Sequence, residues 1–262
     1  MTPDVKHPGE LFDLSGLRAA VVGGTGVLGS RFAECVAAAG AAVTVLGRSE
    51  ERGRSIVDRI RTTGGSASFA RVDTTDRASI ESAAHAMAGD GALDVLINAV
   101  GVNSTTEFGA LSDSEWGRLL EVNLTSVFRT CQTFSPLMRR QEGTASIINI
   151  SSASSGPPLS RVLGYGVAKA GLNNLTQYLA RELAPEGIRV NAIIPGFFPA
   201  EQNRAVLTPE RIANIEGHTP MRRLGNPHEL DGVVLWLAAP LASGFVTGSL
   251  VAVDGGFSAM TI

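Results

Sequence analysis

A regular alternation of short apolar segments with longer helical ones constrains the fold more than any other feature of this chain. The apolar segments do not alternate with polar residues, so each is expected to be a strand that is covered on both faces. Such strands, joined by helices, form a parallel sheet between two helical layers. The sequence therefore predicts an α/β protein with a doubly wound parallel sheet of about seven strands. The expected strands span residues 19–22, 42–46, 67–72, 93–98, 145–150, 189–194 and 249–253.

Helical segments connect the expected strands. Residues 112–140 are expected to form one long helix, because their apolar side chains mostly recur three or four positions apart. No linker, internal repeat or low-complexity stretch divides the 262 residues, so residues 1–262 are expected to form a single domain. Residues 196–227 are less regular and are expected to form an insertion over the carboxyl edge of the sheet, where ligands bind in such folds. The other expected helices span residues 30–40, 49–63, 76–89, 165–183, 209–216 and 229–239.

The composition excludes several classes of function. With 22 basic and 25 acidic side chains, the net charge of −3 provides no general attraction for nucleic acid. Two cysteines are too few for a disulfide framework, and the four histidines are scattered, so no metal is expected. The first 18 residues lack the apolar run of a secretion signal, and no apolar run reaches the length of a membrane span. A soluble cytoplasmic protein without a membrane or nucleic-acid partner is expected.

A glycine-rich turn follows the first expected strand and precedes a helix. Such a turn lets a pyrophosphate approach the backbone and exposes helix amides to it, as in Rossmann-type nucleotide-binding folds. The pattern G-x-G-x-x-G begins at Gly24, but an extra glycine precedes it, so the phase of the loop is open. The same glycines can also form a tight turn alone, although the position between strand and helix favours a nucleotide site. The candidate cofactor-binding residues in the turn are Gly23, Thr25, Gly26, Val27, Leu28 and Gly29.

The end of the second expected strand bears on the choice of cofactor. An NAD-binding chain usually has an acid about 20 residues after the glycine turn, which holds the ribose hydroxyls. Here Gly47, which leaves room, and Arg48 stand 18 and 19 residues after Gly29. Arg48 can pair with the 2′-phosphate of NADP, helped by Ser49, or can be an ordinary solvated residue. Asp73, after the third strand, can accept a hydrogen bond from the adenine amine or cap the next turn. NADP is therefore the expected cofactor, with NAD as the alternative.

A tyrosine and a lysine four residues apart carry the expected chemistry. Tyr165 and Lys169 share one helix face, and a nearby ammonium favours the phenolate, which lowers the tyrosine pKa from about 10 toward neutrality. A phenol tuned in this way can exchange a proton with a substrate hydroxyl. A Tyr-x-x-x-Lys motif alone often arises by chance. Ser152, thirteen residues before Tyr165 and at the end of a strand, makes the combination far less accidental and is expected to hold a carbonyl oxygen.

From about Leu14 to Phe257 the chain resembles the classical short-chain dehydrogenases/reductases. The resemblance implies a catalytic set of Asn123, Ser152, Tyr165 and Lys169. It implies that Lys169 holds the ribose hydroxyls and tunes Tyr165, and that Asn123 anchors a water which links Lys169 to solvent. Two further motifs resemble the family's segment after the fourth strand and its P-G beside the nicotinamide. These motifs add Asn98, Ala99, Gly101, Pro195 and Gly196 to the expected cofactor contacts, with Tyr165 and Lys169.

The glycine turn departs from the family's pattern. The family's T-G-x-x-x-G-x-G aligns with residues 22–29, where Val22 replaces the Thr and Val27 replaces the middle Gly. Pyrophosphate binding is still expected, with the path of the loop left open. The same variant of the turn, together with residues 196–204 and 218–221, resembles a subgroup named mannonate or fructuronate oxidoreductases. This likeness implies a sugar-acid substrate.

These observations together predict an oxidoreductase that transfers a hydride between a nicotinamide cofactor and a secondary alcohol or ketone of a sugar acid or polyol. Two alternatives remain: a 3-oxoacyl thioester reductase and a non-catalytic nucleotide-sensing protein on the same fold. The resemblance implies a homotetramer, and Phe128 and Phe134 on the long helix suit burial against both the sheet and a partner. Arg161 can meet a substrate carboxylate or lie on the surface. The candidate substrate contacts are Asn103, Ser152, Arg161 and Asn203.

Overall fold

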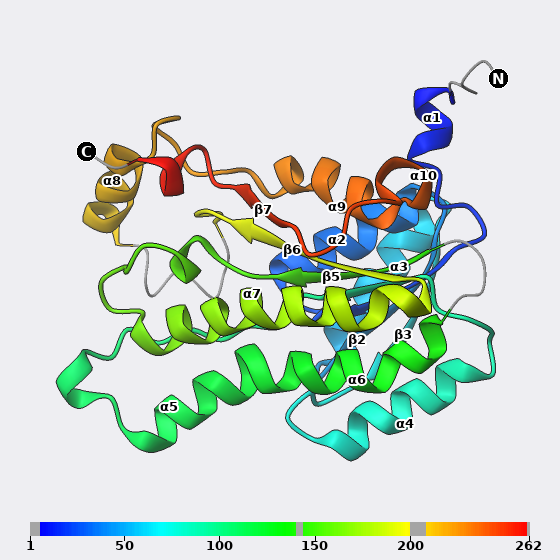
Figure 1. The fold of residues 1–262 in the computed structure, drawn as a ribbon, viewed down its shortest axis with the longest axis horizontal. Coiled ribbons are helices and arrows are strands. Elements are labelled where there is room, and N and C mark those ends of the chain that lie inside the picture. The colour runs from blue at the N-terminus through cyan, green and yellow to red at the C-terminus, as the bar shows by residue number, and fades with distance from the viewer. Residues whose placement is uncertain (1–5, 140–143, 200–207, 261–262) are drawn as a thin grey trace.

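A seven-stranded sheet runs through the middle of the protein, with helices on both faces (Figure 1). The computed structural model describes residues 6–139, 144–199 and 208–260. All strand pairs are parallel, and the order is β3-β2-β1-β4-β5-β6-β7. The predicted doubly wound sheet of about seven strands is therefore confirmed. The strands are β1 (Arg18–Val22), β2 (Ala42–Gly47), β3 (Ser66–Arg71), β4 (Val95–Asn98), β5 (Ala145–Ile150), β6 (Ile188–Pro195) and β7 (Leu250–Val253).

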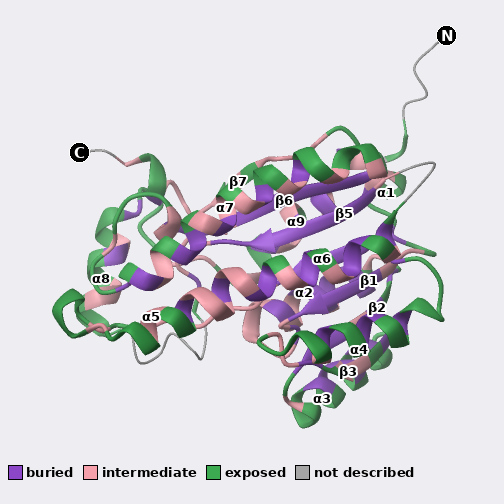
Figure 2. Cartoon of the chain, turned by 60° about the horizontal axis from the view of Figure 1, so that its bottom comes forward, coloured by how far each residue is buried: buried purple, intermediate pink, exposed green. Residues whose placement is uncertain are grey.

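Two helical layers bury the sheet because alternate residues of each strand point to opposite faces. In β1, Ala19 and Val21 belong to one apolar core and Ala20 and Val22 to the other, and all four are at most 1% exposed. Figure 2 shows the buried strands between helices whose outer faces are exposed. One layer contains α2 (Val27–Ala38), α3 (Glu50–Thr62) and α9 (Asp231–Ala238), and the other contains α4 (Arg77–Ala88), α6 (Ser126–Met138) and α7 (Leu163–Leu183).

The strand order places a crevice at the carboxyl edge of the sheet. The chain moves outward from β1 to β2 and β3, then crosses back to β4 on the other side of β1. Ligands bind outside the carboxyl ends of the strands at such a reversal. Helices α5 (Asp113–Leu120) and α8 (Pro209–His218) lie beyond this edge, at the left of Figure 1. Helix α8 belongs to the predicted insertion and extends two residues past its expected end.

The single long helix expected over residues 112–140 is wrong in one respect. A π-helical turn, Glu121–Thr125, separates α5 from α6. Within the turn, the Asn123 side chain donates to the carbonyl oxygen of Leu119 at 2.9 Å, and just after it Ser126 Oγ donates to that of Val122 at 2.7 Å. These side chains take over carbonyls of the helix. Apolar periodicity could not reveal this turn, because the same face stays buried on both sides of it.

Helix α2 begins three residues earlier than expected, at Val27 instead of residue 30. Glycine is a poor helix former, and Gly29 therefore concealed the first turn in the sequence. The early start brings the amino end of α2 directly to the end of β1. Two short helices, α1 (Pro8–Leu11) and α10 (Pro240–Ser243), lie near the opposite, amino edge of the sheet (Figure 1). Among the helices of the described ranges, none has the length and apolar character that a membrane span requires.

Candidate active site

The glycine-rich turn packs tightly between the ends of β1 and β4 and the start of α2. Gly23 has a φ of +76°, which favours glycine, and a Cβ there would lie 2.8 Å from the carbonyl carbon of Ala99. A Cβ on Gly29 would overlap the carbonyl oxygen of Gly23. Gly26 precedes α2 without a side-chain cap, so the first amides of the helix stay open to a ligand. Gly23 and Gly29 thus build the turn, and Gly26 begins the helix.

At the end of β2, the expectation that Gly47 leaves room for a phosphate is wrong. A Cβ on Gly47 would lie 2.5 Å from Oγ1 of Thr25, so the side chain of the turn already fills that space. Arg48 is exposed at the start of the next turn. Ser49 is the N-cap of α3, where its Oγ accepts a hydrogen bond from the backbone nitrogen of Arg52 at 3.3 Å. A positive charge and a hydroxyl therefore stand beside the glycine turn.

Asp73 forms a local turn after β3. Its Oδ1 accepts hydrogen bonds from the backbone nitrogen of Thr75 at 3.0 Å and from its hydroxyl at 2.7 Å. These bonds to Thr75, and to a lesser degree the charge of Arg48, hold the pKa of the Asp73 carboxyl below its usual value. This geometry matches the capping alternative, and it leaves Oδ2 available to a ligand.

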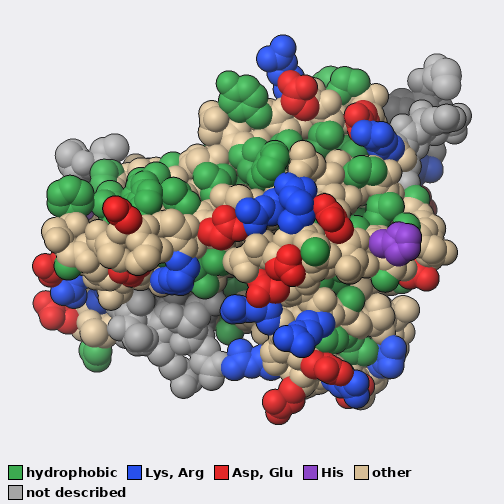
Figure 3. Space-filling model, turned by 90° about the horizontal axis from the view of Figure 1, so that it is seen from below, with side chains coloured by type: hydrophobic (Ala, Val, Ile, Leu, Met, Phe, Trp, Pro, Cys, Tyr) green, Lys and Arg blue, Asp and Glu red, His purple; other side chains and the backbone are tan. Residues whose placement is uncertain are grey.

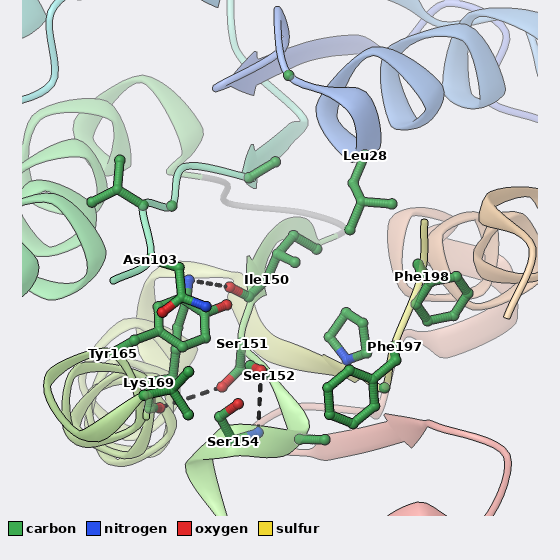
Figure 4. Close-up of a pocket in the computed structure, with 18 of the residues that line it drawn as sticks. Leu28, Asn103, Ile150, Ser151, Ser152, Ser154, Tyr165, Lys169, Phe197 and Phe198 are labelled. Atoms are coloured by element: carbon green, nitrogen blue, oxygen red, sulfur yellow. Dashed lines mark hydrogen bonds between the residues drawn. The ribbon is translucent and has the colours of Figure 1, made fainter. Parts of the chain in front are cut away.

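A cavity opens at the carboxyl edge of the sheet, between the start of α2 and the start of α7 (Figure 4). It encloses about 1120 Å³, including space that is open to solvent. We call it the edge cavity. Four loops supply most of its wall, because four neighbouring strands end there. The cavity is lined by residues 26–29, 99–103, 150–154 and 195–198, together with Leu159, Val162, Tyr165, Lys169 and Arg211.

Three of the predicted catalytic residues meet at the edge cavity. Ser152 follows β5, while Tyr165 and Lys169 lie in the first two turns of α7. Ser152 and Tyr165 line the same part of the cavity, and Lys169 Nζ lies 5.7 Å from the centre of the Tyr165 ring. Figure 4 shows the three side chains close together, with Phe197 across the cavity. The spacing in the sequence therefore does bring a hydroxyl, a phenol and an amine to one place.

The protonation states of this group differ from the expectation. Burial raises the pKa of the Tyr165 phenol, and the hydrogen bond with Ser152 opposes the rise only partly. Burial lowers the pKa of Lys169 to about 7. The Lys169 ammonium donates to the carbonyl oxygens of Ile150 at 2.8 Å and Val100 at 3.3 Å, rather than to the phenol. The expected lowering of the tyrosine pKa is therefore wrong for this structure, because burial has the largest effect on the phenol.

Asn123 lies behind the wall of the edge cavity, within the π-helical turn. Its Oδ1 accepts from the backbone nitrogen of Val102 at 3.1 Å, and its Nδ2 donates to the carbonyl oxygen of Val102 at 2.9 Å. A Cβ on Gly101 would lie 3.2 Å from the same Oδ1. Asn123 thus fixes the loop that follows β4. Its side chain is fully buried, and π turns are frequent at functional sites.

Asn98, an expected cofactor contact, is instead part of a buried hydrogen-bond network. Its Nδ2 donates to Oδ1 of Asn149 at 2.9 Å, and its Oδ1 accepts from Thr130 at 2.8 Å. Asn149 in turn donates to Thr176 at 3.0 Å. The network joins β4 and β5 to α6 and α7 under the edge cavity. Asn98 therefore supports the loops that line the cavity and does not line it.

Most of the other predicted contacts line the edge cavity, and a few lie away from it. Ala99, Gly101, Pro195 and Gly196 line the edge cavity, as do the turn residues from Gly26 to Gly29. Gly23 lies beneath the turn, and Thr25 lies beside Gly47. Asn103 lines the edge cavity.

Arg161 lies apart from the edge cavity. It is exposed, has a φ of +67° and makes an ion pair with Glu107 at 3.5 Å. It lines a neighbouring cavity under α8, which we call the side cavity. This position matches the surface alternative rather than contact at Ser152 and Tyr165. Asn203 falls outside the described residues.

Sequence reasoning missed several residues of the cavity wall, above all Arg211 and Phe197. Arg211 is the third residue of α8, and its side chain lines both the edge cavity and the side cavity. The sequence offers a weak signal for it, because one arginine on a polar helix resembles a solvated residue. Phe197 follows Pro195-Gly196, and its place in that motif could have identified it.

Comparisons with known proteins agree on one family. The family model described as Enoyl-(Acyl carrier protein) reductase matches residues 25–258. An uncharacterized oxidoreductase, UxuB, of Bacillus subtilis (strain 168) is 38% identical and covers 94% of this chain and 96% of its own. The 3-oxoacyl-[acyl-carrier-protein] reductase FabG of Chlamydia pneumoniae is 30% identical over 94% of this chain and 98% of its own.

A solved structure supports the same assignment. The crystal structure of a gluconate 5-dehydrogenase from Burkholderia cenocepacia J2315, in complex with NADP and tartrate, is 32% identical and has a TM-score of 0.92. It covers 97% of this chain, and this chain covers all of it. The sheet, the glycine turn and the edge cavity define an oxidoreductase with a Rossmann-like fold. The chain belongs to the classical short-chain dehydrogenase/reductase family, whose members use NAD or NADP.

Proposed function

We propose that this protein is an NADP-dependent oxidoreductase of a secondary alcohol or ketone in a sugar acid or polyol. The observation that carries the proposal is the meeting of Ser152, Tyr165 and Lys169 in one cavity that begins at the open amino end of α2. The structural neighbour in complex with NADP and tartrate, a hydroxy acid, supports both the cofactor and the substrate class. The likeness of the turn and insertion to mannonate or fructuronate oxidoreductases favours a sugar acid.

The residues of the edge cavity fit a nicotinamide dinucleotide. Gly26 leaves the first amides of α2 uncapped for a pyrophosphate, and Gly101, Pro195 and Gly196 line the path toward Tyr165. Arg48 and Ser49 would hold the 2′-phosphate, and Lys169 the ribose hydroxyls. When bound, the cofactor supplies or accepts the hydride.

Tyr165 is the proposed proton donor and acceptor. Its raised pKa keeps the phenol protonated near neutral pH, which is the form that donates to a carbonyl oxygen during reduction. Ser152 would hold the same oxygen through its hydroxyl. During oxidation of an alcohol, the proton passes the other way, from the substrate hydroxyl to the phenolate.

Lys169 is proposed to resupply the proton. With a pKa of about 7, its amine exists in both forms near neutral pH and can return a proton to the phenolate. Asn123 is proposed to support this path by fixing the loop between Gly101 and Asn103, through the bonds to Val102. A water near this loop would connect Lys169 to solvent.

A 3-oxoacyl thioester reductase is the second candidate, favoured by the FabG relative and by the description of the family model. A spectrophotometric assay of reduced nicotinamide, with NADP and NAD separately, distinguishes the two. The panel contains sugar acids, polyols and a 3-oxoacyl thioester. Turnover of sugar acids or polyols supports the proposal, whereas turnover of the thioester alone supports the second candidate. Cofactor binding without turnover of any compound would favour a nucleotide-sensing protein.

A homotetramer is proposed for the assembly. The layer of α6 and α7 carries exposed apolar side chains, among them Phe128, Val167 and Tyr178, and Figure 3 shows this face from outside. Phe134 is fully buried in the core beside the sheet, so the two phenylalanines of α6 lie on different faces of the helix. At the other end of the sheet, Leu250 on β7 and the nearby Phe245 are also exposed.

A further inference from the structure

Arg211 occupies an unusual position for an arginine of this chain. Among the described residues that line the edge cavity, Lys169 and Arg211 are the charged ones, and both are basic. Arg211, Leu159 and Phe197 also line the side cavity, so Arg211 lies at the partition between the two spaces. It reaches this place because α8 crosses the carboxyl edge of the sheet.

Within the described residues, the hydrogen-bonding capacity of Arg211 is largely unused. A guanidinium carries five N–H donors. Nη2 donates to the carbonyl oxygen of Ser160 at 3.1 Å, which ties α8 to the loop before α7. Nε is buried and has no hydrogen-bond partner within residues 6–139, 144–199 and 208–260. A buried donor without a partner is costly and needs an explanation.

Other arginines of the chain have a structural role, in which the guanidinium pairs with a carboxylate of the protein. Arg223 makes two hydrogen bonds with Glu229, at 2.6 and 2.7 Å, and Arg59 pairs with Glu34. Across the described parts of the chain, no ion pair of this kind involves Arg211. Its neighbour Glu210 lines the side cavity and not the edge cavity. An anion in the edge cavity would thus meet two basic groups and no described carboxylate of its wall.

We infer that Arg211 binds the carboxylate of the substrate, while Ser152 and Tyr165 hold the oxygen that reacts. The planar guanidinium matches a carboxylate, because Nε and a terminal nitrogen form two parallel hydrogen bonds with its oxygens. The inference rests on the proposed function and narrows it, since an acid and not a polyol is then the preferred substrate. Leu159, Val162 and Phe197 supply apolar wall for the carbon chain.

The test compares acids with neutral compounds of the same shape. Wild-type protein and Arg211→Gln are assayed with NADP on a panel of aldonic acids, each paired with the alditol of the same carbon skeleton. The variant should lose about 10- to 150-fold in kcat/KM on the acids, mainly through KM, as expected for a lost charge-assisted bond. Its kcat/KM on the alditols should change little. Arg211→Lys should lose less than Arg211→Gln on the acids, because it keeps the charge but not the planar fork.

Arg161→Gln is the matched control, because Arg161 lines the side cavity alone and pairs with Glu107. It should keep wild-type selectivity for acids. Equal losses of Arg211→Gln on acids and alditols, or no loss on the acids, would overturn the inference. Since the wild type would still turn over the panel in that case, the proposed function would stand.

If the wild type turns over none of the panel, the proposed function fails and calorimetry decides the inference. The NADP-loaded wild type and Arg211→Gln are titrated with the same acids. Weaker binding of an acid by the variant supports a carboxylate site at Arg211. Absent binding, or equal binding by both proteins, overturns it.

Thermal stability separates this role from a structural one. Arg211→Met removes the buried Nε donor that lacks a partner, but it also removes the bond from Nη2 to Ser160, so the two effects should nearly cancel and the ligand-free variant should melt close to the wild-type temperature. A clear fall in the melting temperature, with unchanged selectivity for acids, would assign Arg211 to the packing of α8.

Discussion

The Nζ of Lys169 lies 2.8 Å from the carbonyl oxygen of Ile150, the last residue of β5. Its hydrogen-bond partners in the described chain are neutral carbonyls, so no carboxylate offsets the cost of burying the charge. This arrangement explains the pKa of about 7, and it couples the stability of the protein to pH.

The free energy of unfolding should rise with pH above about pH 7 in the cofactor-free protein. An unfolded lysine keeps its proton to a pKa near 10.4, whereas folded Lys169 loses it near 7, so the unfolded state binds more protons in this range. The rise is at most about 1.4 kcal/mol per pH unit. Urea unfolding of the wild type and Lys169→Met between about pH 7 and 8.5 tests this, because the variant should lack the rise.

The upper limit of this pH range matters. Burial raises the pKa of Cys35 and Cys131 to about 12, so above pH 8.5 the folded state retains thiol protons that the unfolded state loses, and stability then falls. If the free energy of unfolding depends on pH in the same way for the wild type and Lys169→Met below pH 8.5, the lowered pKa of Lys169 is contradicted.

Tyr165→Phe should lower turnover by about 10²- to 10⁴-fold, the usual contribution of general acid–base catalysis. The phenyl ring keeps the packing, so NADP affinity should survive. Steady-state kinetics with a substrate of the panel and fluorescence titration of NADPH measure the two effects. Tyr178→Phe is the matched control, since Tyr178 is the other tyrosine of the chain and is exposed on the same helix. Near-normal turnover of Tyr165→Phe would remove Tyr165 from the mechanism.

Arg48→Ala should raise the KM for NADP by about 10- to 150-fold and leave the KM for NAD nearly unchanged. The physical reason is the loss of a charge-assisted contact to the 2′-phosphate. Arg54→Ala, which removes an exposed arginine paired with Glu50 on α3, should change neither constant. Equal effects of Arg48→Ala on both cofactors, or a wild-type preference for NAD, would show that Arg48 does not bind the 2′-phosphate.

Gly29→Ala should destabilise the protein more than Gly26→Ala. A Cβ at either position approaches the same carbonyl oxygen of Gly23, but at Gly26 the distance is 3.3 Å and at Gly29 the atoms would overlap. Overpacking of this kind costs about 1–3 kcal/mol. Chemical denaturation of both variants measures the difference, and equal losses would mean that the turn relaxes freely.

The protein should have four times the mass of one chain in light scattering at micromolar concentration. Phe128→Glu places a charge on the exposed apolar face of α6, where it should split the assembly. Phe12→Glu is the control, because Phe12 is similarly exposed but lies at the far, amino-terminal side of the molecule. A monomeric wild type would refute the proposed tetramer.

The sequence predicted the sheet well because its strands are short apolar runs that only a doubly covered sheet can bury. It also predicted the meeting of Ser152, Tyr165 and Lys169, because the ends of parallel strands share one edge. The π turn at Asn123 was not predictable, since side-chain bonds to the carbonyl oxygens of Leu119 and Val122 replace the regular pattern without altering the apolar face. The raised pKa of Tyr165 depends on its depth in the fold, which spacing does not encode.

Arg211 illustrates a different limit. It lies 46 residues after Tyr165, in an insertion with little periodicity, so only the crossing of α8 over the sheet edge brings it to the cavity. Arg161, much nearer in sequence, points to the side cavity instead. Proximity along the chain was therefore a poor guide to which arginine lines the edge cavity.

The packing of Thr25 against Gly47 makes the two positions a single unit for anyone who wishes to redesign the cofactor preference. An aspartate introduced at residue 47 has no room, because its Cβ would lie 2.5 Å from the threonine hydroxyl. To change the cofactor preference from NADP to NAD, the side chain at residue 25 has to be made smaller first, for instance with Thr25→Gly. The acid can then be introduced at residue 47. The order of the two steps matters, because the acid fits only after the side chain at residue 25 has been made smaller.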